Sequence, residues 1–143
     1  MKITSRASDY ALLLLMYLTT LPSDSTVSVK TVAKHHHLSL RFLANIANRL
    51  SMARILFSHR GVGGGIRLGR PPSEITVREV IEAVDGPIQT MFCQNTHELC
   101  SHEGLCDMKN FWDEIQGDVM KKLTSKTIGD LIPPSTAPAR IAV

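Results

Sequence analysis

The stretch from Ser28 to Arg70 narrows the folds open to this chain more than any other part of the sequence. Ser28 and Ser39 each precede a segment with apolar residues at helical spacing. Serine is a favoured N-cap because its hydroxyl accepts a hydrogen bond from a backbone N–H of the first turn. Two β-prone runs around the glycine-rich tip GVGGG, at 61–65, follow directly. Two short helices followed by a basic hairpin predict a winged helix-turn-helix.

The second predicted helix, LRFLANIANRL at 40–50, separates an apolar face from a small polar face. At about 100° per residue, the apolar face collects Leu40, Leu43, Ile46, Ala47 and Leu50. The polar face carries Arg41, Asn45 and Asn48 and no acidic residue. In the major groove an arginine can bond guanine and an asparagine can bond adenine. We therefore expect this face to read base edges.

The predicted hairpin would form a wing with basic flanks. Arg60 and Arg67 lie on either side of a tip that is mostly glycine, so the backbone there could approach DNA closely. Phosphate contacts would position the protein and base contacts would specify the sequence. The residues expected at the DNA interface are Ser39, Arg41, Asn45, Asn48, Arg49, Arg60, Gly63, Gly64 and Arg67.

The glycine tip has a rival interpretation as a nucleotide-phosphate loop. A dinucleotide fingerprint starting at Gly61 would need glycine where Ile66 stands, and a P-loop would need Gly-Lys-Ser/Thr. Neither pattern is present. No triad or paired carboxylate points to catalysis either, so we expect a protein that is not an enzyme.

The charge is divided unevenly along the chain. Residues 1–72 carry ten Lys/Arg against Asp9 and Asp24, a balance of +8. Residues 73–143 carry six against eleven acidic residues, a balance of −5. This asymmetry is typical of a polyanion-binding head on a different kind of body, although solvated surfaces can produce it too.

Three further helices are expected. Residues 5–21 are apolar nearly all round, which predicts a buried helix. Thr76 and Glu79 form a capping box that begins the next one. A long helix from about 107 to 126 has an apolar stripe of Met108, Phe111, Trp112, Ile115, Val119 and Leu123. The run YALLLLMYL at 10–18 is far shorter than the roughly 20 residues of a membrane span. We expect a cytoplasmic protein with no membrane partner.

All three cysteines, Cys93, Cys100 and Cys106, lie in the segment CQNTHELCSHEGLC. Thiolates suit iron–sulfur clusters and zinc, but structural zinc sites usually bring cysteines in closer pairs than the C-x6-C-x5-C spacing here. The odd number of cysteines argues against a secreted disulfide framework. We expect an iron–sulfur cluster, with a thiol redox switch and zinc left open. Local candidates for a fourth ligand are His97, His102, Glu103 and Asp107.

Several motifs along the chain match one family. They are M-K-I-T at 1–4, D-Y-A-L at 9–12, L-S-L-R-F-L at 38–43, H-R-G-V-G-G-G-I-R-L at 59–68, R-P-P-S-E-I-T at 70–76, V-I-E-A-V-D-G-P at 80–87 and T-I-G-D-L at 127–131. Through these motifs and the cysteines, residues 1–131 resemble the Rrf2 family of bacterial transcription regulators, the group of IscR, NsrR and RirA.

The resemblance implies a homodimer that binds double-stranded operator DNA under the control of an iron–sulfur cluster, with the long C-terminal helix as the dimerisation helix. The match to the NsrR group implies that Asp9 of the partner chain is the fourth ligand of a 4Fe–4S cluster, which is favoured over 2Fe–2S. His36 is the alternative ligand, since a relative with mixed ligands uses a histidine there. Lys109 stands where IscR-type members place a ligand histidine.

The sequence departs from the family pattern at four positions. Val62 stands where many members have proline, and Ile66 where many have an aromatic residue. His37 and Arg54 stand where glycine is common. The family resemblance therefore does not predict which operator sequence this protein binds.

These observations together predict a mainly α protein with a β-hairpin wing. The expected parts are a winged helix-turn-helix domain at 1–86, a cluster loop at 87–106, a dimerisation helix and end segment at 107–131, and a disordered tail at 132–143. The expected function is a regulator, acting as a repressor, that senses nitric oxide, iron or redox state. One alternative is a clusterless regulator controlled by thiols or a partner. The other, an iron–sulfur carrier or scaffold, would leave the basic head without a use.

Overall fold

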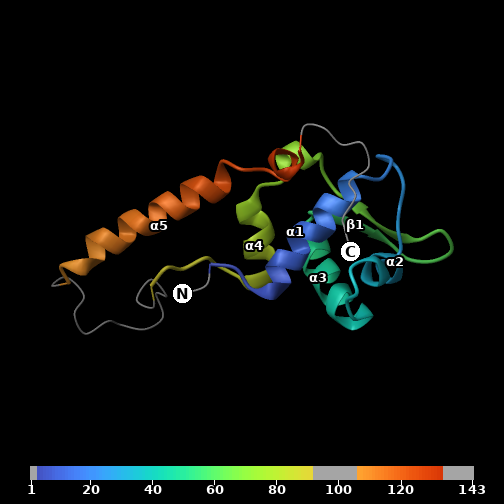
Figure 1. The fold of residues 1–143 in the computed structure, drawn as a ribbon, viewed down its shortest axis with the longest axis horizontal. Coiled ribbons are helices and arrows are strands. Elements are labelled where there is room, and N and C mark those ends of the chain that lie inside the picture. The colour runs from blue at the N-terminus through green and yellow to red at the C-terminus, as the bar shows by residue number, and fades with distance from the viewer. Residues whose placement is uncertain (1–2, 92–105, 134–143) are drawn as a thin grey trace.

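The computed structural model describes residues 3–91 and 106–133. The elements are α1 (Arg6–Thr19), α2 (Val29–His35), α3 (Leu40–Met52), β1 (Leu56–His59), β2 (Gly65–Leu68), η1 (Pro72–Glu74), α4 (Val77–Asp85), α5 (Met108–Thr124) and η3 (Gly129–Leu131). Helices α1–α4 and the hairpin form a head, from which α5 projects (Figure 1). The mainly α fold with a hairpin wing is as predicted. Cys93, Cys100 and residues 134–143 of the predicted tail lie outside the described residues.

Side-chain caps begin the helices where the sequence predicts them. Ser28 and Ser39 each accept a hydrogen bond from the backbone N–H three residues further on, at 3.0 and 3.2 Å. The capping box of Thr76 and Glu79 begins α4. Because each cap satisfies an N–H that the helix leaves free, it is worth about 1 kcal/mol. These local signals fix where α2, α3 and α4 start.

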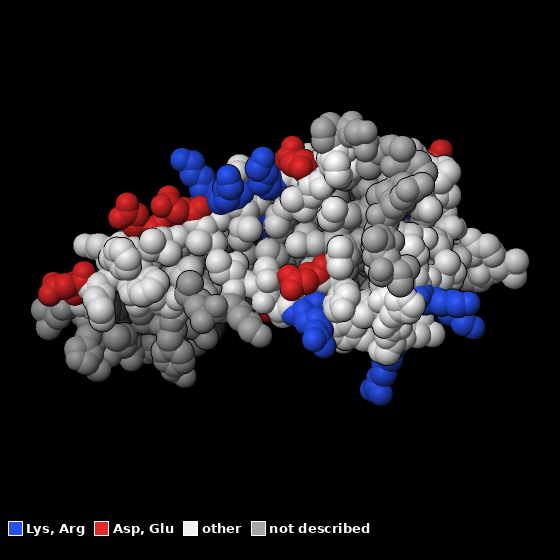
Figure 2. Space-filling view, in the orientation of Figure 1, with Lys and Arg blue, Asp and Glu red and all other residues white. Residues whose placement is uncertain are grey.

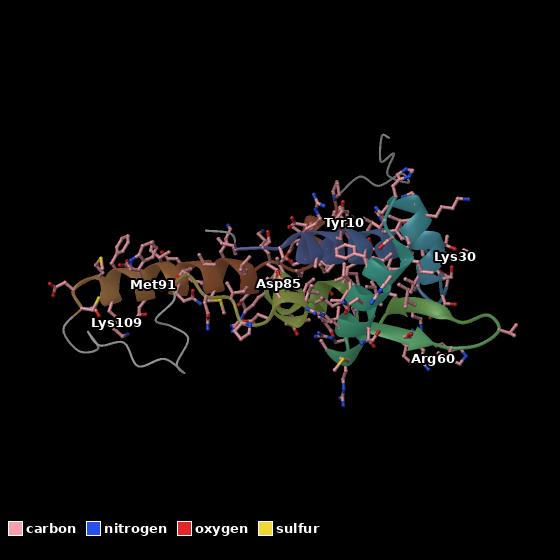
Figure 3. The ribbon with its side chains drawn as sticks, turned by 90° about the horizontal axis from the view of Figure 1, so that it is seen from below. Tyr10, Lys30, Arg60, Asp85, Met91 and Lys109 are labelled. Atoms are coloured by element: carbon pink, nitrogen blue, oxygen red, sulfur yellow. The ribbon has the colours of Figure 1, made fainter. Side chains whose placement is uncertain are left out.

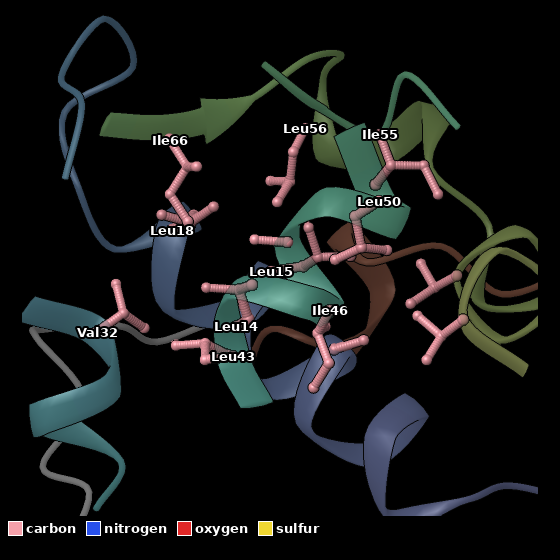
Figure 4. Close-up of a cluster of buried hydrophobic side chains, with 14 of the residues drawn as sticks. Leu14, Leu15, Leu18, Val32, Leu43, Ile46, Leu50, Ile55, Leu56 and Ile66 are labelled. Atoms are coloured by element: carbon pink, nitrogen blue, oxygen red, sulfur yellow. The ribbon is translucent and has the colours of Figure 1, made fainter. Parts of the chain in front are cut away.

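The core lies between α1, α3 and the base of the wing (Figure 4). Leu14 and Leu15 from α1 and Leu43 and Leu50 from α3 have no exposed surface. The apolar faces of α3 and α1 are buried only in part. Leu40 is 49% exposed, because it lies in the first turn of α3 at the edge of the apolar face. α1 is not buried all round, since Leu13, on the side away from its buried residues, is 41% exposed.

The wing is an antiparallel pair in which Leu56 lies opposite Leu68 and His59 opposite Gly65. The loop before α2 adds a further bridge, because Val27 and Ile66 exchange backbone hydrogen bonds of 3.1 and 2.8 Å. A Cβ at Gly65 would lie 2.5 Å from the carbonyl oxygen of Val27, so this close approach requires glycine. The wing is thereby attached to the helix-turn-helix.

His37 and Arg54, two of the departures from the family pattern, have φ of +53° and +57°. They are the only non-glycine residues with positive φ among the described residues. Each follows a helix in a Schellman arrangement. At Arg54, the N–H of Arg54 donates to the carbonyl of Ser51, and the N–H of Ile55 donates to the carbonyl of Leu50. Left-handed backbone favours glycine, so the common glycine of the family has a physical reason at both positions.

Replacing Arg54 with glycine is expected to stabilise the protein by about 1 kcal/mol, because strain of about 1–3 kcal/mol is relieved at a smaller entropic cost. Urea unfolding measures the change. Ala53→Gly is the matched control, since Ala53 has a negative φ of −80° and should only lose stability. Equal destabilisation by both substitutions would contradict the prediction.

Helix α5 joins the head through its C-terminal half. Val119, Met120 and Leu123 pack against a small cluster formed by Val77, Ile81 and Ile88. In the N-terminal half, Met108 and Phe111 are 63% and 56% exposed. The helix ends earlier than expected, because the carbonyl of Lys126 accepts a hydrogen bond from the N–H of Val77 at 2.8 Å instead of continuing the helix.

Within residues 3–91 and 106–133, none of the helices combines the length and the apolar character that a membrane crossing requires.

Candidate nucleic-acid interface and cluster ligands

The exposed face of α3 carries the predicted base-reading side chains. Arg41, Asn45 and Asn48 are all exposed, while the buried residues of α3 lie on the other side. Met52, which is also exposed, continues this face, and the Asn48 amide lies 3.9 Å from its sulfur. An arginine and two amides on a solvent-facing helix can bond base edges in a major groove. Ser39, also predicted at the interface, is used as the N-cap of this helix.

Arg49, predicted to contact phosphate, has a partner within the protein. Its guanidinium donates a hydrogen bond to the backbone carbonyl of Val84, at the end of α4. Its backbone lies in the last turn of α3, beside the polar face rather than on it. The side chain thus ties the recognition helix to α4, and its phosphate contact stays a prediction.

The wing presents Arg60 and Arg67 as expected. Arg60 is exposed near the tip (Figure 3). The guanidinium of Arg67 lies over the ring of Phe57, 4.6 Å from its centroid, and the two residues are opposite each other in the hairpin. Phe57 is 46% exposed, and this cation–π contact holds Arg67 in place. Phe57 was not among the residues predicted at the interface, although its pairing with Arg67 across the hairpin could have indicated the contact.

The tip of the wing has the backbone that close approach to DNA requires. Gly63 has φ of +72°, and its carbonyl accepts a hydrogen bond from the hydroxyl of Thr26 at 3.2 Å. A Cβ at Gly64 would lie 2.4 Å from the carbonyl oxygen of His59. The tip therefore remains free of side chains on both sides of its turn, apart from the fully exposed Val62.

The charges seen in the sequence separate in space. Figure 2 shows acidic side chains in a row along α5 and lysine or arginine side chains around the head, below α2 and α3. Lysines gather again in the last turn of α5. A polyanion would therefore meet the least repulsion at the head.

Asp9 lies in the first turn of α1 and is exposed. Its carboxylate makes no hydrogen bond or ion pair with any of the described residues. It lines an open hollow of about 600 Å³ together with Arg6, Tyr10 and two exposed apolar residues, Ile3 and Leu13. The carboxylate is therefore free to bind a cation that another surface brings to this partly apolar hollow.

Cys106, the one predicted cysteine ligand that the structure describes, lies at the start of α5 and is half-buried. Its carbonyl accepts a hydrogen bond from the N–H of Lys109 at 3.1 Å. Lys109 itself pairs with Asp113 one turn further along the helix. Among the residues described in one chain, no three His, Cys, Asp or Glu side chains converge on a metal position.

His36, the alternative ligand, is the C-cap residue of α2 and packs against α1. The centroids of the Tyr17 and His35 rings lie 5.7 and 4.9 Å from that of His36, both edge-on. Its Nε2 is buried and has no hydrogen-bond partner among the described residues. Burial and then the charge of His35 lower the pKa of His36, which favours the neutral ring. Tyr17, which His36 contacts, lies about two turns after Asp9 on α1. The role of His36 as a ligand stays a prediction.

Asp85, which was not among the predicted site residues, joins the beginning of α1 to the end of α4. Its two carboxylate oxygens accept hydrogen bonds from the N–H and the hydroxyl of Ser5, at 3.0 and 2.6 Å. Burial raises the pKa of the Asp85 carboxyl, but hydrogen bonds from Ser5 and Ser8 and the charge of Arg49 outweigh it and hold that pKa below its usual value.

A recognition helix with exposed arginine and amide side chains beside a hairpin wing defines a winged-helix DNA-binding protein. The model of the Rrf2 family, described as an iron-dependent transcriptional regulator, matches residues 4–134, so the chain belongs to this family. Members of this family bind DNA and are transcription regulators rather than enzymes.

Solved structures share this fold. CymR of B. subtilis, described as its global cysteine regulator, is 28% identical with a TM-score of 0.75, and the match covers 92% of this chain and 96% of CymR. A candidate transcriptional regulator from Listeria innocua is 26% identical with a TM-score of 0.77, covering 100% and 94%. IscR of T. potens is 24% identical with a TM-score of 0.69 over 92% and 85%, a likeness of fold.

Proposed function

We propose that this Rrf2-family regulator is a homodimeric repressor of the bacterial cytoplasm whose operator binding is controlled by an iron–sulfur cluster. The cluster would be held by Cys93, Cys100 and Cys106 of one chain and Asp9 of the other. The observation that carries the ligand assignment is the exposed, unpaired Asp9 carboxylate in its partly apolar hollow. Because this carboxylate has no partner among the described residues, it is free to bind a metal ion held by a second chain.

Operator binding would use α3 and the wing. Arg41, Asn45 and Asn48 would read bases in the major groove, while Arg60, Arg67 and the glycine tip would contact the neighbouring backbone or groove. The Phe57 ring under Arg67 would keep that guanidinium extended along the wing. A dimer would place two such heads on half-sites one helical turn, about 34 Å, apart.

Dimerisation would use the exposed half of α5. Met108 and Phe111 are large apolar side chains that the described residues of one chain leave uncovered, and Phe111 lies edge-on to Trp112 with ring centroids 5.3 Å apart. Exposed aromatic and methionine side chains on a projecting helix are typical of an interface core. Pairing of α5 with its copy would bury them.

The donor set fits an iron–sulfur cluster with a labile iron. Three thiolates are its ordinary ligands, and the fourth, an oxygen ligand, would bind iron more weakly. Bound there, the cluster would supply iron that reacts with nitric oxide or oxygen or exchanges with the iron pool. Asp9 would join the first turn of α1 in one chain to the cysteine segment of the other, so its release would change how the two heads are placed.

Asp9→Ala tests this assignment. We expect the cluster to be lost about tenfold faster or more, because a direct ligand should matter at least as much as an outer-shell group. DNA affinity should shift toward that of cluster-free protein. Loss of visible absorbance under nitric oxide or a chelator gives the rate. Asp24→Ala, at an exposed aspartate in the loop before α2, is the control. Unchanged cluster loss and DNA affinity in Asp9→Ala would contradict the proposal.

A clusterless regulator controlled by its thiols or by a protein partner is the second candidate. The identity to CymR, the global cysteine regulator of B. subtilis, is 28%, against 24% to IscR of T. potens. Iron and sulfide analysis of anaerobically purified protein separates the two candidates. Colourless protein without iron would favour the second.

A further inference from the structure

We propose that Asp85 is a positioning residue that couples the first turn of α1, where Asp9 lies, to the recognition helix α3. The proposal rests on the proposed function, because it assigns the path by which a change at Asp9 reaches the DNA-reading face. Asp85 is the last residue of α4 and lies on the side of the head toward the exposed end of α5 (Figure 3). This is where the segment that leads to the cysteines leaves the head.

The first link joins Asp85 to the helix that carries Asp9. Both carboxylate oxygens of Asp85 are bonded to Ser5, the N-cap of α1. The carbonyl of Ser5 in turn accepts the N–H of Asp9 at 3.1 Å. The side chain of Ser5 also caps the N–H groups of Ala7 and Ser8, at 3.0 and 3.2 Å. A displacement of Asp9 therefore acts on the same turn that Asp85 holds.

The second link joins the end of α4 to α3. The guanidinium of Arg49, in the last turn of α3, bonds the carbonyl of Val84, the residue before Asp85. Arg49 and Asp85 also line the same hollow between these two helices. The guanidinium of Arg49 thus bonds the carbonyl of the residue before Asp85, and its charge lowers the pKa of the Asp85 carboxyl. Arg49 lies one residue after Asn48, so the base-reading face shares its helix with this tie.

The third link is the chain that follows Asp85. Gly86 has φ of +85° and ends α4, with its N–H bonded to Glu82 at 3.0 Å. Two residues further, the carbonyl of Ile88 accepts a hydrogen bond from the side chain of Gln116 on α5 at 2.6 Å. Asp85 is therefore placed where α1, α3, α4 and the approach to the cysteine segment meet.

The test compares operator affinity of cluster-loaded and cluster-free protein in variants that interrupt the links. Asp85→Asn keeps the shape of the side chain and removes its charge and one acceptor. Ser5→Ala removes the hydroxyl, and with it the 2.6 Å bond to Asp85 and the caps of the Ala7 and Ser8 N–H groups. The matched control is Asp130→Asn, because Asp130 bonds the N–H and the hydroxyl of Thr127 at 2.8 and 3.0 Å, far from α3 along the chain.

In the unaltered protein we expect the two affinities to differ by about tenfold or more, a usual size for coupling between two sites. Asp85→Asn and Ser5→Ala should bring that ratio to within about twofold of one while both still bind the cluster. Asp130→Asn should keep the full ratio. Thermal unfolding is measured alongside, since a purely structural cap would lower stability in all three variants and leave the ratio intact.

If Asp85→Asn and Ser5→Ala both keep the affinity ratio of the unaltered protein, the inference is overturned and the proposed function still stands. If cluster-loaded and cluster-free samples of the unaltered protein bind the operator with equal affinity, the proposed function fails and the inference fails with it. Should Asp85→Asn not fold, Ser5→Ala alone decides between these results.

Discussion

A glutamate in place of Phe111 is expected to convert the dimer into a monomer and to lower operator affinity by about 100-fold. Phe111 is 56% exposed in a single chain and packs edge-on against Trp112, so its ring is available to a second copy. Truncating a central aromatic residue of an interface commonly costs about 2 kcal/mol or more, and a buried unpaired charge costs still more. A monomer would also lose the simultaneous binding of two half-sites.

Sedimentation and DNA titration at one salt concentration measure these effects. Asn110→Glu is the matched control, because it places the same charge at an exposed position of the same helix, about 100° around the axis from Phe111 and further from Met108. We expect Asn110→Glu to remain dimeric and to bind as tightly as the unaltered protein. A dimeric Phe111→Glu variant would show that this face of α5 is not the interface.

Arg41→Ala is expected to weaken binding to the operator by about 10–100-fold, which corresponds to about 1–3 kcal/mol for the loss of a bidentate contact to guanine. Binding to unrelated DNA should fall much less, since its affinity comes from phosphate contacts spread over the head. The exposed position of Arg41 on α3, beside Asn45 one turn on, is the basis for this expectation. Fluorescence anisotropy with operator and scrambled DNA measures both affinities.

Lys122→Ala controls for the loss of a single positive charge. Lys122 is exposed in the last turn of α5, outside α3 and the wing. Removing it should change operator and non-specific binding equally and slightly. If Arg41→Ala weakens both kinds of binding by the same factor, Arg41 contacts phosphate and does not read bases.

The helix starts and the wing could be predicted from the sequence because their causes are local. Ser28, Ser39 and the box at Thr76 act within one turn, and the glycine tip acts within one hairpin. The left-handed backbone at Arg54 is also local, but it was not predicted, although glycine is common at this position in the family. The exposed face of α3 was predicted from the helical spacing of its apolar and polar residues alone. These parts of the account rest on signals that a few neighbouring residues carry.

Contacts between distant segments could not be predicted in the same way. The tie from Arg49 to Val84 and the hydrogen bonds from Ser5 to Asp85 join residues that are 35 and 80 positions apart. Leu13 belongs to an apolar run but faces solvent, because only the packing of α1 decides which side is covered. The capping box of Ser5 and Ser8 was missed since the usual Glu or Gln partner is a serine here. All four proposed cluster ligands, Cys93, Cys100, Cys106 and Asp9, stay predictions.

The most direct test of the central claim is one titration. Protein purified without oxygen is examined for visible absorbance, iron and sulfide, and operator-sized DNA is then titrated with cluster-loaded and cluster-free samples at the same salt concentration. The account predicts a coloured, iron-containing dimer whose affinity changes by about tenfold or more when the cluster is removed. A colourless, iron-free protein, or equal affinities in the two samples, would contradict it.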